Sequence, residues 1–152
     1  IIFVKPACSQ LYFLGGSFVW LLVLQGGMLL SLDSKSFICN GSGAWPLSGL
    51  SFLGSALLTT FFTAVILFWG WKTLRAEPAE GKSSYNNPVL WALIAGAGLS
   101  HTLERVTSDC VVDYWHLSLL QHTLYFNLGD ISLTIGALGL IALWLRESKV
   151  SF

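Results

Sequence analysis

The sequence predicts an all-α membrane protein with four transmembrane helices, two outward-facing loops and both chain ends in the cytoplasm. Its 152 residues are 54% hydrophobic and only 11% charged, whereas an ordinary soluble domain is about 45 to 50% apolar and roughly 25% charged. Four apolar stretches have about 20 residues each, the length that a helix needs to cross a hydrocarbon core of roughly 30 Å. Because their hydrophobicity is continuous rather than alternating, we expect helices and not the strands of a barrel.

The four predicted spans belong to a single domain, residues 1–152, and run approximately over residues 11–32, 50–71, 88–106 and 127–145. The segment between the second and third spans is polar and basic, so the positive-inside rule places it in the cytoplasm. After four crossings, both chain ends fall on that same side, and the loops at residues 33–49 and 107–126 face outward. The basic residues expected in the cytoplasm are Lys5, Lys72, Arg75, Lys82, Arg146 and Lys149.

Small residues and cysteines suggest how spans and loops are held together. Small residues allow membrane helices to approach closely, and the candidates are Gly26, Gly27, Gly96 and Gly98.

Cys39 and Cys110 lie one in each outward loop, where an oxidising compartment would permit a disulfide. Two free thiols are the alternative.

Charge, cysteines and histidines exclude several classes of function. Eight basic and eight acidic side chains cancel, and no basic patch interleaved with aromatic residues is present, so no nucleic-acid partner is expected. The three cysteines form no CxxC pair, so no metal site and no cofactor are predicted. A redox subunit with His101, His116 or His122 as ligands is not favoured, because only His101 lies in a predicted span and no second span offers a facing histidine.

Two aspartates, Asp113 and Asp130, bracket a neutral, aromatic-rich segment beside the fourth span. Two carboxyl groups that lie close together share a proton, and such a pair can activate water and protonate a leaving amine, as in aspartic proteases. The alternative is structural. Asn127 would cap the fourth helix, Asp130 would occupy its dipole-favoured first turn, and Asp113 would be a solvated loop residue.

The third span ends in SHTLERV, which places His101, Glu104 and Arg105 on one helical face. Charged side chains at the edge of a span normally point into the bundle and pair there, which makes them candidates for function. An interfacial anchor is the alternative for these three residues.

Two motifs, VVD at residues 111–113 and FNLGD at residues 126–130, follow this span in order. Together they resemble the lipoprotein signal peptidases, or signal peptidase II, a family of four-helix membrane aspartic proteases. The segment NGSGAW, from Asn40 to Trp45, is similar to the family's first outer loop, although Ser42 stands where a glycine is usual. The resemblance covers the chain from about Asn40 to Leu145.

The resemblance implies an enzyme that cuts the signal peptide from a lipid-modified prolipoprotein. Such an enzyme is multi-pass in the bacterial inner (plasma) membrane, is surrounded by membrane lipids, and has its active site at the outer face. Asp113 and Asp130 would be the catalytic pair. The residues that would bind substrate or support the pair are Asn40, His101, Glu104, Arg105 and Asn127.

The chain is a divergent member of this pattern. The family usually has Asn where His101 stands and Asp where Glu104 stands, and Gln25 occupies the position of an acidic residue in the first helix. Because both aspartates are present, we expect activity. The alternative is a non-catalytic subunit, similar to signal peptidase II, that binds lipid or scaffolds a larger membrane complex.

Overall fold

The structure is a computed structural model, and it describes residues 6–33, 37–41, 52–75, 87–119 and 122–148. Several residues that the sequence singled out lie outside these ranges, namely Lys5, Lys82, Lys149 and residues 42–45 of the NGSGAW segment; the side chain of His122 is likewise not described.

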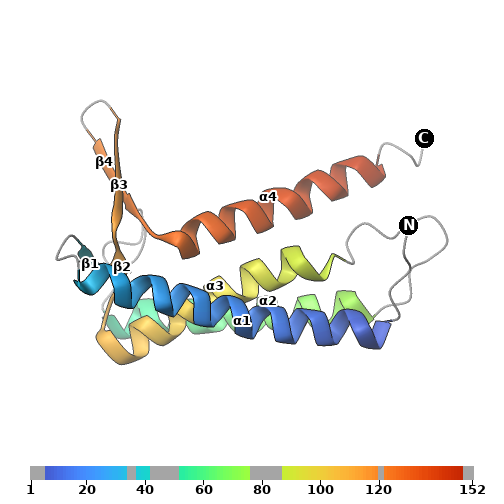
Figure 1. Ribbon diagram of the computed structural model, residues 1–152. Coiled ribbons are helices and arrows are strands. Elements are labelled where there is room, and N and C mark those ends of the chain that lie inside the picture. Colours follow the sequence, from blue (N-terminus) through green and yellow to red (C-terminus); the bar gives the residue numbers. More distant parts are fainter. Residues whose placement is uncertain (1–5, 34–36, 42–51, 76–86, 120–121, 149–152) are drawn as a thin grey trace.

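Four helices run side by side with alternating direction (Figure 1). They are α1 (Pro6–Asp33), α2 (Phe52–Arg75), α3 (Pro88–Ser108) and α4 (Leu128–Ser148). Within the described residues, α1, α2 and α4 contain stretches of 23, 23 and 19 residues that are apolar enough to cross a membrane. The prediction of a mostly helical membrane protein with four helices is confirmed.

The helix α3 lies in the middle of the bundle and packs against each of the other three helices. It is less apolar than its neighbours because its second half carries Ser100, Glu104 and Arg105, all of which are buried. Its start is fixed by Asn87, whose side chain accepts hydrogen bonds from the backbone N–H groups of Val89 (3.0 Å) and Leu90 (3.3 Å). The side chains of Ser100, Glu104 and Arg105 therefore face the protein and not lipid.

Glycine allows α3 to approach its neighbours closely. A Cβ at Gly96 would lie 2.9 Å from the backbone oxygen of Ser17 in α1, and one at Gly98 would lie 2.8 Å from Oγ1 of Thr63 in α2. The expected close contacts at these two positions are confirmed. The expectation for Gly26 is wrong, because a Cβ there would meet nothing within 4 Å. A Cβ at Gly27 would lie 3.5 Å from Oη of Tyr114, which is an ordinary contact distance.

Short strands gather at one end of the bundle (Figure 1), within the two segments that were expected to be loops. The strand β1 (Ile38–Asn40) pairs antiparallel with β2 (Val111–Asp113), while β3 (Trp115–Leu119) and β4 (His122–Phe126) form a hairpin. A disulfide joins Cys39 to Cys110, with the two Cα atoms 5.5 Å apart. Of the two alternatives for these cysteines, the structure has the bridge, and it fastens β1 to the chain just before β2.

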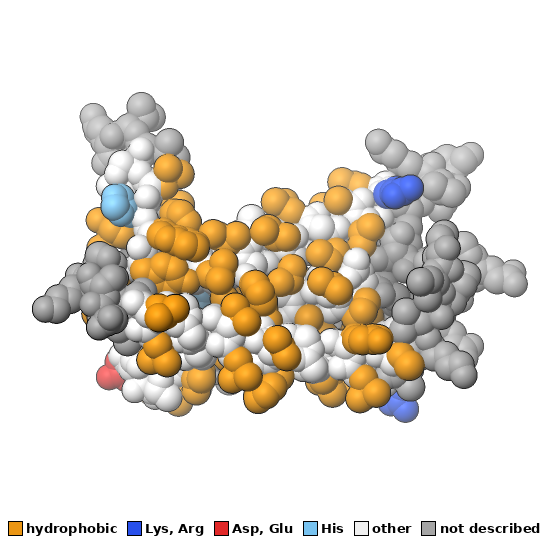
Figure 2. Space-filling view, in the orientation of Figure 1, with side chains coloured by type: hydrophobic (Ala, Val, Ile, Leu, Met, Phe, Trp, Pro, Cys, Tyr) orange, Lys and Arg blue, Asp and Glu red, His pale blue; other side chains and the backbone are white. Residues whose placement is uncertain are grey.

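The surface is consistent with a lipid environment. Figure 2 shows hydrophobic side chains spread over the helices, while the Lys and Arg side chains visible on this face lie at the end of the bundle away from the strands. The basic residues in the last turns of the described helices include Lys72 and Arg75 in α2 and Arg146 in α4. Lys72, Arg75 and Arg146 thus lie at the end away from the strands, whereas Arg105, in the last turn of α3, is buried near the strands.

Candidate active site

Asp113 is the last residue of β2 and is only 4% exposed. Its Oδ2 accepts a hydrogen bond from Nδ2 of Asn40 (3.2 Å), and its Oδ1 accepts one from Nδ2 of Asn127 (2.9 Å). The register of the sheet places Asn40 beside β2, and the start of α4 places Asn127 on the other side. Asp113 is therefore held from two segments that are far apart in the sequence, and it is not a solvated loop residue.

Asp130 lies in the first turn of α4, where it forms a reciprocal cap with Asn127. The backbone N–H of Asn127 donates to Oδ2 of Asp130 (2.9 Å), and the backbone N–H of Asp130 donates to Oδ1 of Asn127 (3.1 Å). The capping interpretation is thus right for both residues. It does not exclude a second role, because the Asp130 side chain is still 44% exposed.

Asn127 connects the two aspartates. Its side-chain nitrogen donates to the carboxylate of Asp113, and its backbone nitrogen donates to the carboxylate of Asp130. A single buried asparagine therefore brings the two carboxyl groups of VVD and FNLGD to the same place in the fold.

His101 lies beside this asparagine. Its Nε2 is 3.2 Å from Oδ1 of Asn127 and 3.9 Å from Oδ1 of Asp130. The neutral ring can donate a hydrogen bond to Asn127 from Nε2, and a protonated ring would also form an ion pair with Asp130. His101 is 12% exposed, so it faces the site and not the membrane surface.

Glu104 fixes the strand that carries Asp113. Its Oε2 accepts a hydrogen bond from the backbone N–H of Val112 (2.9 Å). Its Oε1 accepts one from Oγ of Ser100 (3.0 Å) and a longer one from Nε2 of Gln25 (3.4 Å). Gln25 also donates to Ser100 (2.8 Å), so α1, α3 and β2 meet in one buried polar cluster.

The side chain of Arg105 points toward α2. Its Nη1 donates to Oγ of Ser55 in α2 (3.1 Å), and Ser55 donates to the backbone oxygen of Gly41 (3.4 Å). The Nε of Arg105 is buried and has no hydrogen-bond partner among the described residues. Because His101, Glu104 and Arg105 all point inward, the alternative of an interfacial anchor is wrong.

Burial raises the pKa of the Asp113 carboxyl above its ordinary value of 3.8. The hydrogen bond from Asn40 opposes this increase in pKa, while the negative charge of Asp130 adds to it. Smaller opposing effects come from Asn127 and His101. The net result favours a proton on the buried member of the pair.

A small pocket opens next to Asp113, with a volume of about 230 Å³. Its walls come from the segment that leads into β1 and from the β3–β4 hairpin, so it is largely aromatic. The lining residues are Phe37, Ile38, Asp113, Tyr114, Trp115, His116 and Tyr125. The pocket provides space in which an extended peptide segment could reach the buried carboxyl.

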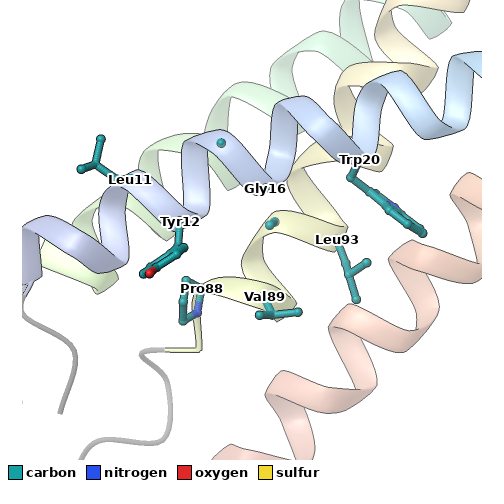
Figure 3. Close-up of a pocket in the computed structure, with 9 residues that line it drawn as sticks. Leu11, Tyr12, Gly16, Trp20, Pro88, Val89 and Leu93 are labelled. Carbon is teal, nitrogen blue, oxygen red and sulfur yellow. The ribbon is translucent and has the colours of Figure 1, made fainter. Parts of the chain in front are cut away.

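A larger, apolar pocket of about 510 Å³ lies between α1 and α3, in the half of the bundle away from the strands (Figure 3). Leu11 and Tyr12 line its α1 side, and Pro88 and Val89 line its α3 side. Trp20 also lines this pocket, and its indole N–H donates to Oγ of Ser132 in α4 (3.0 Å). Because its lining is apolar apart from a tyrosine hydroxyl and an indole N–H, the pocket is suited to hydrophobic chains and not to bond cleavage.

Metal ligation has no support in the part of the chain that the structure describes, since no group of three or more His, Cys, Asp or Glu side chains could hold an ion there. His116 stands on the exposed hairpin, where its ring packs at 6.1 Å from that of Tyr125.

Sequence reasoning missed several residues that build the site. Ser100 stands four residues before Glu104, and this helical spacing could have revealed the pair. Tyr114 follows VVD directly, and its hydroxyl accepts a hydrogen bond from the backbone N–H of Leu128 (3.0 Å). Ser55, by contrast, is brought to Arg105 only by the packing of α2 on α3, and no local pattern signals it.

A family model described as signal peptidase (SPase) II matches residues 14–146. The chain belongs to the signal peptidase II family. The match includes both aspartates, Asn127 and the three inward-facing residues of α3. Membership in this family implies cleavage of lipoprotein signal peptides.

A solved structure supports the same fold for this signal peptidase II family member. That structure is described as a bacterial membrane enzyme determined by the in meso method at 2.3 Å resolution. The two chains are 20% identical, the similarity covers 90% of this chain and 92% of the other, and the TM-score is 0.66. A comparison with curated protein sequences found no match.

Proposed function

We propose that this signal peptidase II family member is an active aspartic endopeptidase that cuts signal peptides from lipid-modified prolipoproteins. The observation that carries the proposal is the pair of hydrogen bonds from Asn127, one to Asp113 and one to Asp130. Paired carboxyl groups in one buried site, with different exposure to water, are what this chemistry needs.

Each aspartate then has its own role. Asp113, whose pKa is raised by burial, carries the proton. Asp130 is the more exposed carboxylate and sits at the N-terminal end of α4, where negative charge is favoured. Asp130 takes a proton from a water molecule as the water oxygen attacks the scissile carbonyl carbon. Asp113 gives its proton to the carbonyl oxygen, which yields a tetrahedral diol.

The second half of the reaction reverses these proton movements. The carbon–nitrogen bond breaks, the leaving nitrogen takes the proton from Asp130, and the diol returns a proton to Asp113 as the new carboxyl group forms. Both aspartates end in their starting states, so no further reactant besides water is consumed.

The substrate enters from lipid in this proposal. Its hydrophobic signal sequence would use the apolar pocket between α1 and α3 (Figure 3), while the scissile segment would lie in the smaller pocket beside Asp113. Arg105 would hold a polar group of the substrate, since its buried Nε has no hydrogen-bond partner among the residues that the structure describes. Asn40 holds Asp113 in position.

We place the strands and both aspartates at the outer face of a bacterial inner membrane, with the single domain spanning it four times. A disulfide such as Cys39–Cys110 persists in an oxidising compartment. The basic ends of α2 and α4 lie at the opposite end of the bundle, which favours the cytoplasm for that end. Both chain ends would then be cytoplasmic.

The alternative is a non-catalytic subunit that binds lipid or scaffolds a membrane complex. It predicts that the carboxyl groups lie apart or are blocked by a partner. The hydrogen bonds of Asn127 to both aspartates, and the hydrogen bond of Val112 to Glu104, weigh against carboxyl groups that lie apart.

Cleavage of a lipid-modified precursor by the purified protein in liposomes tests the proposal. Asp113→Asn and Asp130→Asn should each abolish cleavage while the helical circular dichroism stays the same. Asp109→Asn is the matched control, since Asp109 is an exposed aspartate at the C-cap of α3, and it should retain activity. Cleavage at the wild-type rate by both site variants would overturn the assignment.

A further inference from the structure

We propose that His101 and Gly129 are a sterically matched pair that positions Asn127, which makes His101 a positioning residue of the cleavage site. This inference rests on the proposed function above.

The hydrogen bonds of Asn127 explain why its amide needs a fixed orientation. Oδ1 faces two groups, the backbone N–H of Asp130 at 3.1 Å and Nε2 of His101 at 3.2 Å. Nδ2 then donates to Oδ1 of Asp113 and to the backbone oxygen of Val112 (3.3 Å). If the amide turned over, its NH₂ group would face the N–H of Asp130 and its oxygen would face the carboxyl of Asp113.

A donor on His101 therefore holds the amide in the orientation that serves Asp113. With the proton on Nε2, the neutral imidazole donates to Oδ1 of Asn127. This adds a second donor to that of the Asp130 backbone and makes the turned-over amide less favourable. His101 acts on Asp113 through Asn127 and does not need to touch the substrate.

Gly129 leaves the space that the imidazole occupies. A Cβ at this position would lie 2.5 Å from Nε2 of His101 and 2.8 Å from Oδ1 of Asn127. Contacts this short force a shift, and both groups in the way are parts of the hydrogen bond itself. We infer that a residue with a side chain is not accommodated at position 129 because the imidazole of His101 occupies that space.

A double-mutant cycle tests the pair, with His101→Asn, Gly129→Ala and the double variant compared with the wild type in liposomes. Gly129→Ala should lower kcat at least tenfold, because its methyl group displaces His101 or the Asn127 amide. His101→Asn should lower kcat several-fold and leave KM unchanged, because the histidine acts through Asn127 and does not touch the substrate. The double variant should be more active than Gly129→Ala, because the shorter asparagine leaves room for the methyl group.

Two results would overturn the inference. One is a Gly129→Ala variant with wild-type kcat, and the other is a double variant whose loss is the product of the two single losses. The same cycle measured as Tm in detergent separates this failure from a failure of the proposed function. If the wild type cuts no precursor, the proposed function fails, and additive Tm changes would then refute the pair as well. Gly26→Ala is the matched glycine control, since its added methyl group would meet nothing within 4 Å.

Discussion

The backbone N–H of Val112 donates a 2.9 Å hydrogen bond to Oε2 of Glu104, eight residues earlier in the chain. Both residues are 4% exposed, so neither can exchange this bond for water. Val112 immediately precedes Asp113, and the bond therefore links the last turns of α3 to the residue next to a site aspartate. Ser100 holds the other oxygen of Glu104 at 3.0 Å, which leaves the carboxylate little freedom.

Removal of this acceptor should weaken both the fold and the proposed cleavage. Glu104→Ala leaves the buried N–H of Val112 without a partner, and an unsatisfied buried group of this kind costs about 1 to 3 kcal/mol. We expect a lower Tm in detergent. We also expect kcat to fall roughly tenfold or more, because β2 would no longer hold Asp113 in position and misplaced catalytic groups lose rate steeply. Glu104→Gln keeps one oxygen and should lose less than Glu104→Ala. Equal Tm and kcat in wild type and Glu104→Ala would contradict the role of this bond.

The pKa of Asp113 predicts a pH dependence of stability with a definite sign. Because burial raises the pKa of this carboxyl above 3.8 in the folded protein, the folded state binds the proton more tightly than the unfolded state. The resulting stabilisation is complete below the unfolded pKa and is lost as the pH rises through the raised pKa. The Tm of the wild type should therefore fall with pH, relative to that of Asp113→Asn, across this window.

Activity should follow the same titration. If protonated Asp113 donates to the scissile carbonyl oxygen, kcat should decline on the alkaline side as this carboxyl loses its proton. Parallel Tm curves for the wild type and Asp113→Asn at all pH values would mean that the carboxyl titrates alike in the folded and unfolded chain. That result would remove the argument for Asp113 as the proton donor.

The helices and the two aspartates could be predicted from sequence because both signals are local. Continuous apolar stretches define the helices, and the motif around Asp113 is contiguous. The sheet between β1 and β2 could not be predicted, since it pairs Asn40 with Val111 across 71 residues and each strand has only three residues. The hairpin did have a local signal, because apolar and polar residues alternate from Trp115 to Leu119. The segment was instead interpreted as an aromatic-rich loop.

The supports of the site were the hardest part to predict, because they depend on which helix faces lie together. Gln25 reaches Ser100 at 2.8 Å only because α1 packs on α3, and Ser55 reaches Arg105 only because α2 does. The inward direction of His101 was one of two alternatives for the same helical face. The contacts of His101 with Asn127 and Asp130 at the start of α4 settle it, and they depend on the packing of α4 on α3.

The disulfide between Cys39 and Cys110 should control the site through Asn40. The bridge holds β1 against the chain before β2, and the next residue, Asn40, donates to Oδ2 of Asp113. Reduction frees a strand of only three residues, so we expect this hydrogen bond to weaken while the four helices remain. Dithiothreitol should therefore lower the kcat of the wild type several-fold without a change in helical circular dichroism.

Variants can separate this effect from other actions of the reductant. Cys8 is a free, exposed cysteine, and Cys8→Ser should keep both the wild-type activity and its sensitivity to dithiothreitol. Cys39→Ser/Cys110→Ser should show the lowered kcat from the start and should not respond further. Asn40→Ala should be impaired in the oxidised state, and reduction should add little, because the contact that the bridge protects is already absent. A full additional loss on reduction of Asn40→Ala would show that the disulfide acts through other contacts of β1.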